Sequence, residues 1–118
     1  MTITRGDTLN LKINYLTKER EPIEISSNEV IKFTVKNKID GLQIFQKVIT
    51  IENYDSTNKC YNMTIEPSDT ASVSLNGKDR VDYYYDFEFS NSQTGLVKTL
   101  DKGKFSIKYD ITTPVQGG

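Results

Sequence analysis

Alternation of apolar and polar residues dominates this chain, and it is sharpest between residues 81 and 89. From Tyr83 onward every second position is aromatic, and acidic residues fall between the aromatic ones. A β-strand sends successive side chains to opposite faces of its sheet, so the pattern predicts a half-buried strand. One face would carry Tyr83, Tyr85, Phe87 and Phe89, and the other Tyr84, Asp86 and Glu88. A single polar face favours an antiparallel sandwich over a parallel sheet buried on both sides.

The same period of two recurs along most of the chain. It predicts further strands over residues 9–15, 31–36, 61–65, 96–100 and 105–111, with a short extended piece over 22–25. Between Leu42 and Ile51 the apolar phase slips by one residue, which predicts a β-bulge or an edge strand near Phe45 and Gln46.

Turn signals separate these segments. Glycine-bearing clusters predict turns at residues 37–41, 76–77, 91–95 and 101–103. Pro67 ends the strand before it, and Ser68 or Asp69 could serve as an N-cap, so at most one short helical turn is predicted near Ser68–Ala71.

Together these features predict an immunoglobulin-like antiparallel β-sandwich. About seven to eight short strands follow one another at the roughly 8–12-residue spacing typical of such folds. The chain has 118 residues, enough for one domain with its own core. We expect a single domain over residues 1–112 and a flexible tail over 113–118, which has the composition of a linker.

Composition limits the kinds of partner that the protein could bind and the cellular compartment in which it would fold. The chain has 15 Lys and Arg against 16 Asp and Glu, scattered along its length, which predicts no basic footprint for nucleic acid. The lone Cys60 has no partner for an internal disulfide, which favours folding in a reducing cytoplasm. No apolar run follows Met1, so we expect neither a signal peptide nor membrane insertion.

The inventory of catalytic side chains is small. The chain has no histidine, which excludes Ser-His-Asp and Cys-His catalysis, and Cys60 has no candidate base beside it. A hairpin of the strands at 81–89 and 96–100 would bring together the carboxylates of Asp82, Asp86, Glu88 and Asp101. Calcium sites and glycosidase pairs need such neighbours, but a solvated strand face explains the same alternation more simply. We therefore predict no catalytic residue, no cofactor and no metal site.

Two short motifs have ordinary structural interpretations. Arg5-Gly6-Asp7 spells the integrin-recognition tripeptide, but it immediately precedes a strand, where Gly6 would serve a turn. Asn62-Met63-Thr64 matches the N-glycosylation pattern but lies inside a predicted strand.

Two parts of the chain resemble a known family. The opening Ile3–Thr8 is followed by an alternating strand, and the closing segments run Tyr83–Phe87, Thr94-Gly95, Leu96–Leu100 and Lys102–Ile107. In this order they resemble small immunoglobulin-like modules of tailed bacteriophages, in particular the N-terminal domain of phage baseplate upper proteins. Residues from about Glu21 to Leu75 share only the strand pattern of such modules.

The resemblance implies a non-enzymatic virion structural protein. Such a module docks onto other phage structural proteins of a tail, baseplate or neck, or onto copies of itself, after synthesis in the host cytoplasm. The candidate interface residues are Tyr84, Asp86 and Glu88 on the polar strand face, with Phe45 and Lys47 on the irregular edge segment. An alternative is a carbohydrate- or cell-surface-binding module in which Tyr84 stacks on a sugar.

Overall fold

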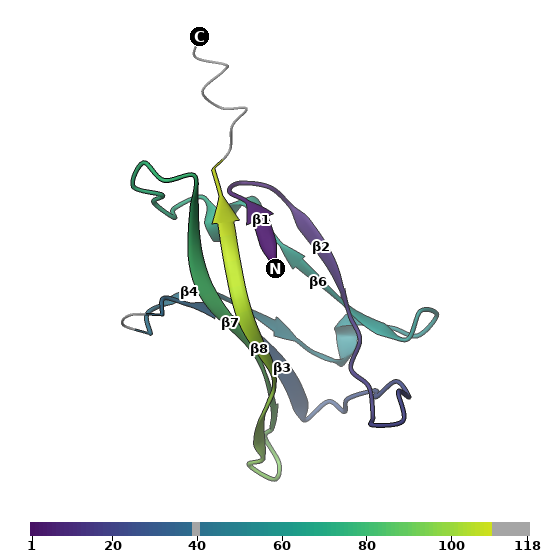
Figure 1. The fold of residues 1–118 in the computed structure, drawn as a ribbon. Coiled ribbons are helices and arrows are strands. Elements are labelled where there is room, and N and C mark those ends of the chain that lie inside the picture. Colours follow the sequence, from purple (N-terminus) through teal and green to yellow (C-terminus); the bar gives the residue numbers. More distant parts are fainter. Residues whose placement is uncertain (39–40, 110–118) are drawn as a thin grey trace.

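Two β-sheets pack face to face in the computed structural model, which describes residues 1–38 and 41–109 (Figure 1). The larger sheet has five strands in the order β1-β8-β7-β3-β4, and the smaller has three in the order β2-β6-β5. The strands are β1 (Thr2–Thr4), β2 (Leu9–Ile13), β3 (Glu29–Lys36), β4 (Gln43–Ile49), β5 (Tyr54–Asp55), β6 (Cys60–Ile65), β7 (Arg80–Asn91) and β8 (Val97–Lys108). The predicted all-β sandwich is confirmed.

The connections follow the immunoglobulin pattern. In that fold the second, fifth and fourth strands lie side by side in one sheet, and the third, sixth and seventh lie side by side in the other. Here β2, β6 and β5 occupy the first set of positions, and β3, β7 and β8 occupy the second. The short β1 runs parallel to the end of β8, with Thr2 opposite Ser106. β1 was not predicted, because a strand of three residues with one apolar side chain, Ile3, is too short to show a period of two.

The core lies between the two sheets and is rich in aromatic residues. As predicted, Tyr83, Phe87 and Phe89 of β7 are buried, whereas Tyr84 is 40% exposed. The fully enclosed side chains come from both sheets, and the largest of them are Tyr61, Phe33, Phe105, Ile31, Ile49, Ile65 and Ile107.

The hairpin of β7 and β8 corrects one predicted turn. Residues 101–103 do not reverse the chain, because β8 runs without a break from Val97 to Lys108 along the whole of β7. The pairing passes from Phe87 opposite Asp101 to Glu88 opposite Thr99, so Leu100 is an extra residue that forms a bulge. Gly103 lies opposite Tyr85, and a Cβ atom built there would be 2.9 Å from the Tyr85 ring. Gly103 therefore leaves space for the Tyr85 ring inside a strand and does not form a turn.

The irregular segment after the turn at Gly41 is an edge strand with a bulge, as predicted. β4 lies at one edge of the five-stranded sheet. Its pairing passes from Phe45 opposite Val35 to Gln43 opposite Lys36, which leaves Ile44 without a partner on β3. The bulge is thus one residue from the predicted position.

The helical turn near residue 68 forms, with a different cap. Helix α1 spans Pro67–Thr70, its N-cap is Glu66, and neither Ser68 nor Asp69 holds that position. Instead the Asp69 carboxylate accepts a hydrogen bond of 2.7 Å from the Glu66 amide. Pro67 explains the shift, since a proline without an N–H is well suited to the first helical position. A 3-10 turn, η1 (Ile51–Asn53), lies in the loop before β5.

Buried polar contacts fix two loops on the sandwich. The Tyr61 hydroxyl donates to the Ile23 carbonyl at 2.6 Å and accepts from the Ile25 amide at 2.8 Å. These bonds hold residues 22–25, which were predicted to be extended and form one isolated bridge, from Pro22 to Leu16. At the other end of the sandwich, the buried Thr70 hydroxyl accepts from the Gly6 amide at 2.9 Å.

Replacing Gly103 by alanine should destabilise the protein by about 1 kcal/mol, because the methyl group displaces the Tyr85 ring. Chemical denaturation of G103A measures the loss. In a Tyr85→Ser background the same change should cost less, since the ring is gone. An equal cost in both backgrounds would contradict the close packing of this pair.

Tyr61→Phe should destabilise the protein by about 1–3 kcal/mol, because it leaves the buried Ile25 amide without its acceptor. Thermal and urea unfolding measure this effect. Tyr54→Phe is the matched control, since the Tyr54 ring lies 5.0 Å from that of Tyr61 but its hydroxyl has no hydrogen bond to another described residue. Similar losses in the two variants would show that the hydroxyl contacts of Tyr61 are unimportant.

Candidate functional site

The candidate site is the outer face of the five-stranded sheet, meaning the side turned away from the three-stranded sheet. Alternation along β7 places Tyr84, Asp86 and Glu88 together on this face, while their neighbours in sequence fill the core. No other described element covers it, because the three-stranded sheet lies against the opposite side (Figure 1). Three of the five predicted interface residues therefore share one open surface.

Lysines surround Tyr84 on this face. It lies opposite Lys104 on β8 and opposite Lys36 on β3. The ammonium of Lys38 lies 5.3 Å from the centre of the Tyr84 ring, within the range of a cation–π contact. The most exposed aromatic ring of this sheet is thus set among positive charges.

The two acidic residues of the predicted set occupy the next positions along β7. Asp86 lies between Lys102 on β8 and Thr34 on β3, and Glu88 lies opposite Lys32. Opposite charges on neighbouring strands stabilise a sheet weakly. A protein that presented like charges at the same positions would be repelled. The register of the sheet, rather than the order of residues in the chain, creates this arrangement.

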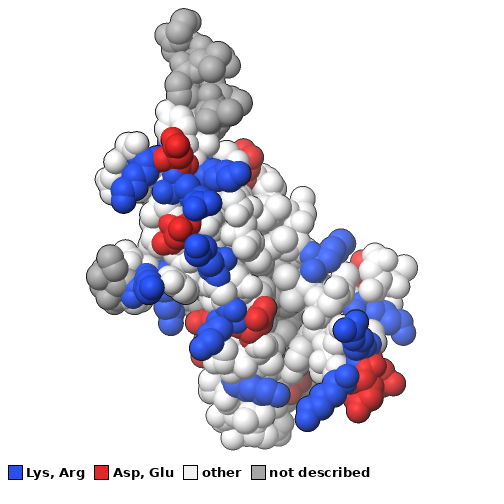
Figure 2. Space-filling model, viewed as in Figure 1, with Lys and Arg blue, Asp and Glu red and all other residues white. Residues whose placement is uncertain are grey.

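Among the described residues, this face carries more cations than carboxylates, although the charges of the whole chain nearly balance. Figure 2 shows cationic side chains along β7 and β8 with acidic ones between them. The basic residues are Lys32, Lys36, Lys38, Arg80, Lys102, Lys104 and Lys108. The acidic residues are Asp82, Asp86 and Glu88. A scattered sequence distribution therefore becomes a locally positive surface once the strands pair.

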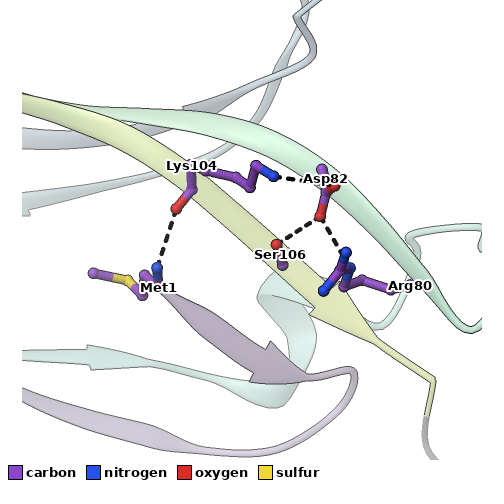
Figure 3. Close-up of polar contacts among 5 residues, drawn as sticks. All are labelled: Met1, Arg80, Asp82, Lys104 and Ser106. Carbon is purple, nitrogen blue, oxygen red and sulfur yellow. Dashed lines mark hydrogen bonds and ion pairs between the residues drawn. The ribbon is translucent and has the colours of Figure 1, made fainter.

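Asp82 is the best-connected charge on this face (Figure 3). Its carboxylate accepts a hydrogen bond of 2.6 Å from the Ser106 hydroxyl and forms ion pairs with Arg80 at 3.3 Å and Lys104 at 3.7 Å. Beside it the amino group of Met1 donates to the Lys104 carbonyl at 3.2 Å. The network joins β7 to β8, and β8 to the start of the chain.

These contacts lower the pKa of Asp82. The hydrogen bond from Ser106 is the main cause, and the charges of Arg80 and Lys104 add to it. Each of them stabilises the ionised carboxylate more than the protonated one. The network thus favours the folded state only while Asp82 is ionised.

The other two predicted interface residues do not belong to this surface. Phe45 is buried, and its ring packs 5.7 Å from that of Phe105. Lys47 also lies on the inner side of β4 and forms an ion pair of 2.6 Å with Asp69 of α1. The exposed apolar residues of this edge are instead Leu42 and Val48, at 64% and 50%. Val48 is an odd number of residues from Phe45, so it lies on the opposite face of the strand. This spacing was the feature of the sequence that could have identified Val48 as exposed.

The structure also places the other sequence motifs. Asp101 lies on the opposite side of the sheet from Asp86, beside the Tyr85 hydroxyl, so the predicted carboxylates do not all meet. Within the described ranges, no group of three or more His, Cys, Asp or Glu residues could hold a metal ion. Arg5 donates to the Val73 carbonyl at 3.1 Å, and Gly6 adopts a φ of 83° in a turn. Cys60 is buried.

Comparison with protein-family models finds no match, and comparison with curated proteins finds none either. In the part of the chain that the structure describes, no helix is long and apolar enough to cross a membrane.

Asp82→Asn should destabilise the protein near neutral pH and have less effect in acid. The folded-state pKa is lowered, so the stabilisation is present above the unfolded pKa of about 3.9 and is lost as the pH falls towards the folded value. Unfolding of both proteins across this range measures the difference. Asp86→Asn is the control, because Asp86 forms no ion pair with a described residue. A D82N effect that does not change with pH would contradict the role of its charge.

Proposed function

We propose that this protein is a structural module of a tailed-bacteriophage particle that docks onto other structural proteins of a tail, baseplate or neck. It would be made in the host cytoplasm and then carried in the virion. The observation that supports this best is the open outer face of the five-stranded sheet, where Tyr84 lies among lysines and beside two carboxylates. The resemblance of both chain ends to phage immunoglobulin-like modules supplies the biological setting.

The chemistry of this face suits a protein interface. Tyrosine is enriched at binding hot spots because one ring buries much apolar area and its hydroxyl can still form a hydrogen bond. The surrounding Lys36, Lys38 and Lys104 would attract a partner that presents acidic side chains. Asp86 and Glu88 would then fix the register of the two proteins rather than the strength of binding.

The exposed edge strand adds a second kind of contact. β4 has no neighbour on one side among the described strands, and Val48 lies exposed on it. Unpaired backbone groups at a sheet edge can pair with a strand of another protein. The outer face and this edge are continuous, since Gln46 of β4 donates to Thr34 on β3 at 2.9 Å.

A non-catalytic role fits the side chains available. The chain has no histidine, and its single thiol, Cys60, is buried. The exposed carboxylate with the most contacts, Asp82, is engaged by Ser106, Arg80 and Lys104. We therefore propose a role in particle assembly rather than in catalysis.

Carbohydrate binding is the second candidate, because Tyr84 is exposed and carboxylates lie beside it. The ammonium of Lys38 lies over the ring, where a stacked sugar would have to displace it. This geometry favours the protein interface.

Tyr84→Ala should weaken binding to the partner by about tenfold or more, because it removes the aromatic anchor. The tagged protein would be co-purified with the products of the genes that flank its own, and the affinity of the recovered complex measured by calorimetry. We expect a tail, baseplate or neck component to co-purify.

Tyr109→Ala is the matched control for this test. Tyr109 is 38% exposed and has the Arg5 guanidinium 5.9 Å from its ring, so it resembles Tyr84 in exposure and contact but lies away from the outer face. Equal losses in the two variants would contradict the assignment to the outer face. Binding of glycans that disappears in Y84A, without any structural partner, would favour the carbohydrate candidate.

A further inference from the structure

A groove of about 630 Å³ opens on the side of the sandwich where β2 and β8 lie across from each other. It is separate from the outer face described above, because it enters between the two sheets. Its lining comes from β2 and the residues after it, from the inner side of β7, and from the first half of β8. The lining residues include Ile13, Tyr15, Tyr85, Leu100, Lys98 and Asp101.

Free strand edges border the groove on both sides. β2 is the edge strand of the three-stranded sheet, with β6 as its only strand neighbour in the described chain. On the other side, β1 covers only the end of β8, from Ser106 to Lys108. Residues 97–103 of β8 have β7 on one side and no described strand on the other. In an immunoglobulin sandwich a further strand lies beside the position of β2.

The groove exposes residues that point towards the core. Ile13, Tyr15, Tyr85 and Leu100 pack against the core but are only partly buried. Leu16, at the same opening, is 40% exposed. By contrast, Phe33 and Ile65 are fully enclosed where the two sheets cover each other. The three-stranded sheet is therefore too narrow to cover the inner side of the larger sheet.

Positive charge predominates at the rim. Lys12 and Lys98 line the opening, against one carboxylate, Asp101, and the Lys12 ammonium donates to the Asn62 side chain at 2.6 Å. Asp101 interacts with the Tyr85 hydroxyl, whose pKa is raised by burial and by this neighbouring charge. Lys98 forms no ion pair with any other described residue. The charge of Lys98 is therefore available to an acidic side chain of a ligand.

We propose that this groove binds an extended acidic segment of a partner polypeptide, which pairs with β2 as a fourth strand of the smaller sheet. Backbone hydrogen bonds to the free edge of β2 would hold the segment antiparallel to it. Apolar side chains at every second position would cover Tyr85 and Leu100, and acidic ones between them would lie beside Lys12, on the outer side of the smaller sheet. The exposed Lys98 at the rim would attract the acidic segment as a whole. The groove lies between two sheets, so it has room for a single strand. A second copy of this chain would have to insert the edge of a whole sheet, which is too thick for the groove.

The test uses a synthetic peptide of alternating valine and glutamate, titrated into the isotope-labelled protein and followed by NMR. We expect saturable shifts of amides in β2 and at Leu100 and Asp101, with little change at Tyr84. A peptide of the same composition with its valines in one block should not bind, since it cannot place them all on one face. Absence of binding by the alternating peptide at millimolar concentration, or shifts confined to the outer face, would overturn the proposal.

Two further versions of the peptide test backbone pairing without altering the protein. One is N-methylated at the odd positions and the other at the even positions, so that only one of them loses the hydrogen-bond donors that face β2. One version should lose binding and the other should retain it. Equal binding by both would exclude strand addition.

Charge reversal tests the rim. Lys98→Glu should weaken binding of the acidic peptide by up to about fivefold, as expected for an exposed ion pair. Lys78→Glu, a similar change outside the groove, should have no effect. Equal effects of the two variants would show that the acidic peptide responds to net charge alone and would refute the assignment to this rim.

Discussion

The structure depends on one aromatic cluster, centred on the Phe33 ring. This ring is fully buried and lies 4.8 Å from that of Phe87, 5.6 Å from Tyr85, 6.0 Å from Phe105 and 6.1 Å from Phe45. These residues come from four neighbouring strands, β3, β7, β8 and β4. A shift of any one strand by one residue would turn its aromatic ring to solvent and bring a polar side chain into the core. The cluster therefore fixes the register of most of the larger sheet.

The same register determines both surfaces that we assign to binding. Because Phe87 and Tyr85 point inward, Tyr84 and Asp86 must point outward, opposite the lysines of β3 and β8. The larger sheet is also wider than its partner, since five strands face three. The inner side of its β7–β8 hairpin is therefore only partly covered, and the groove beside β2 results. One surface is charged and open, and the other is apolar and narrow, so they suit different partners.

Several features were predictable because they depend on neighbours in the sequence. The alternation around Phe87, the phase slip near Phe45 and the proline that begins α1 each act within a few residues. The prediction of a turn at 101–103 was wrong, because an Asp-Lys-Gly triplet is typical of turns. The opposing Tyr85 ring, which the sequence does not reveal, is the reason that a glycine is needed inside this strand. Phe45 was assigned to a surface because a slipped phase leaves both faces apolar, and the choice of face then depends on the opposite sheet.

Alternation and turn residues were enough to predict the all-β class, most of the strands and the inward face of β7, because these features follow from a period of two along the chain. The folded structure was needed to show which strands pair, and with that how Lys36, Lys38 and Lys104 gather around Tyr84. It also decided the Asp82 network, whose partner Ser106 lies on another strand. Contacts between strands join residues that are far apart in the sequence. Local patterns such as alternation or the spacing of charges therefore do not reveal which strands become neighbours.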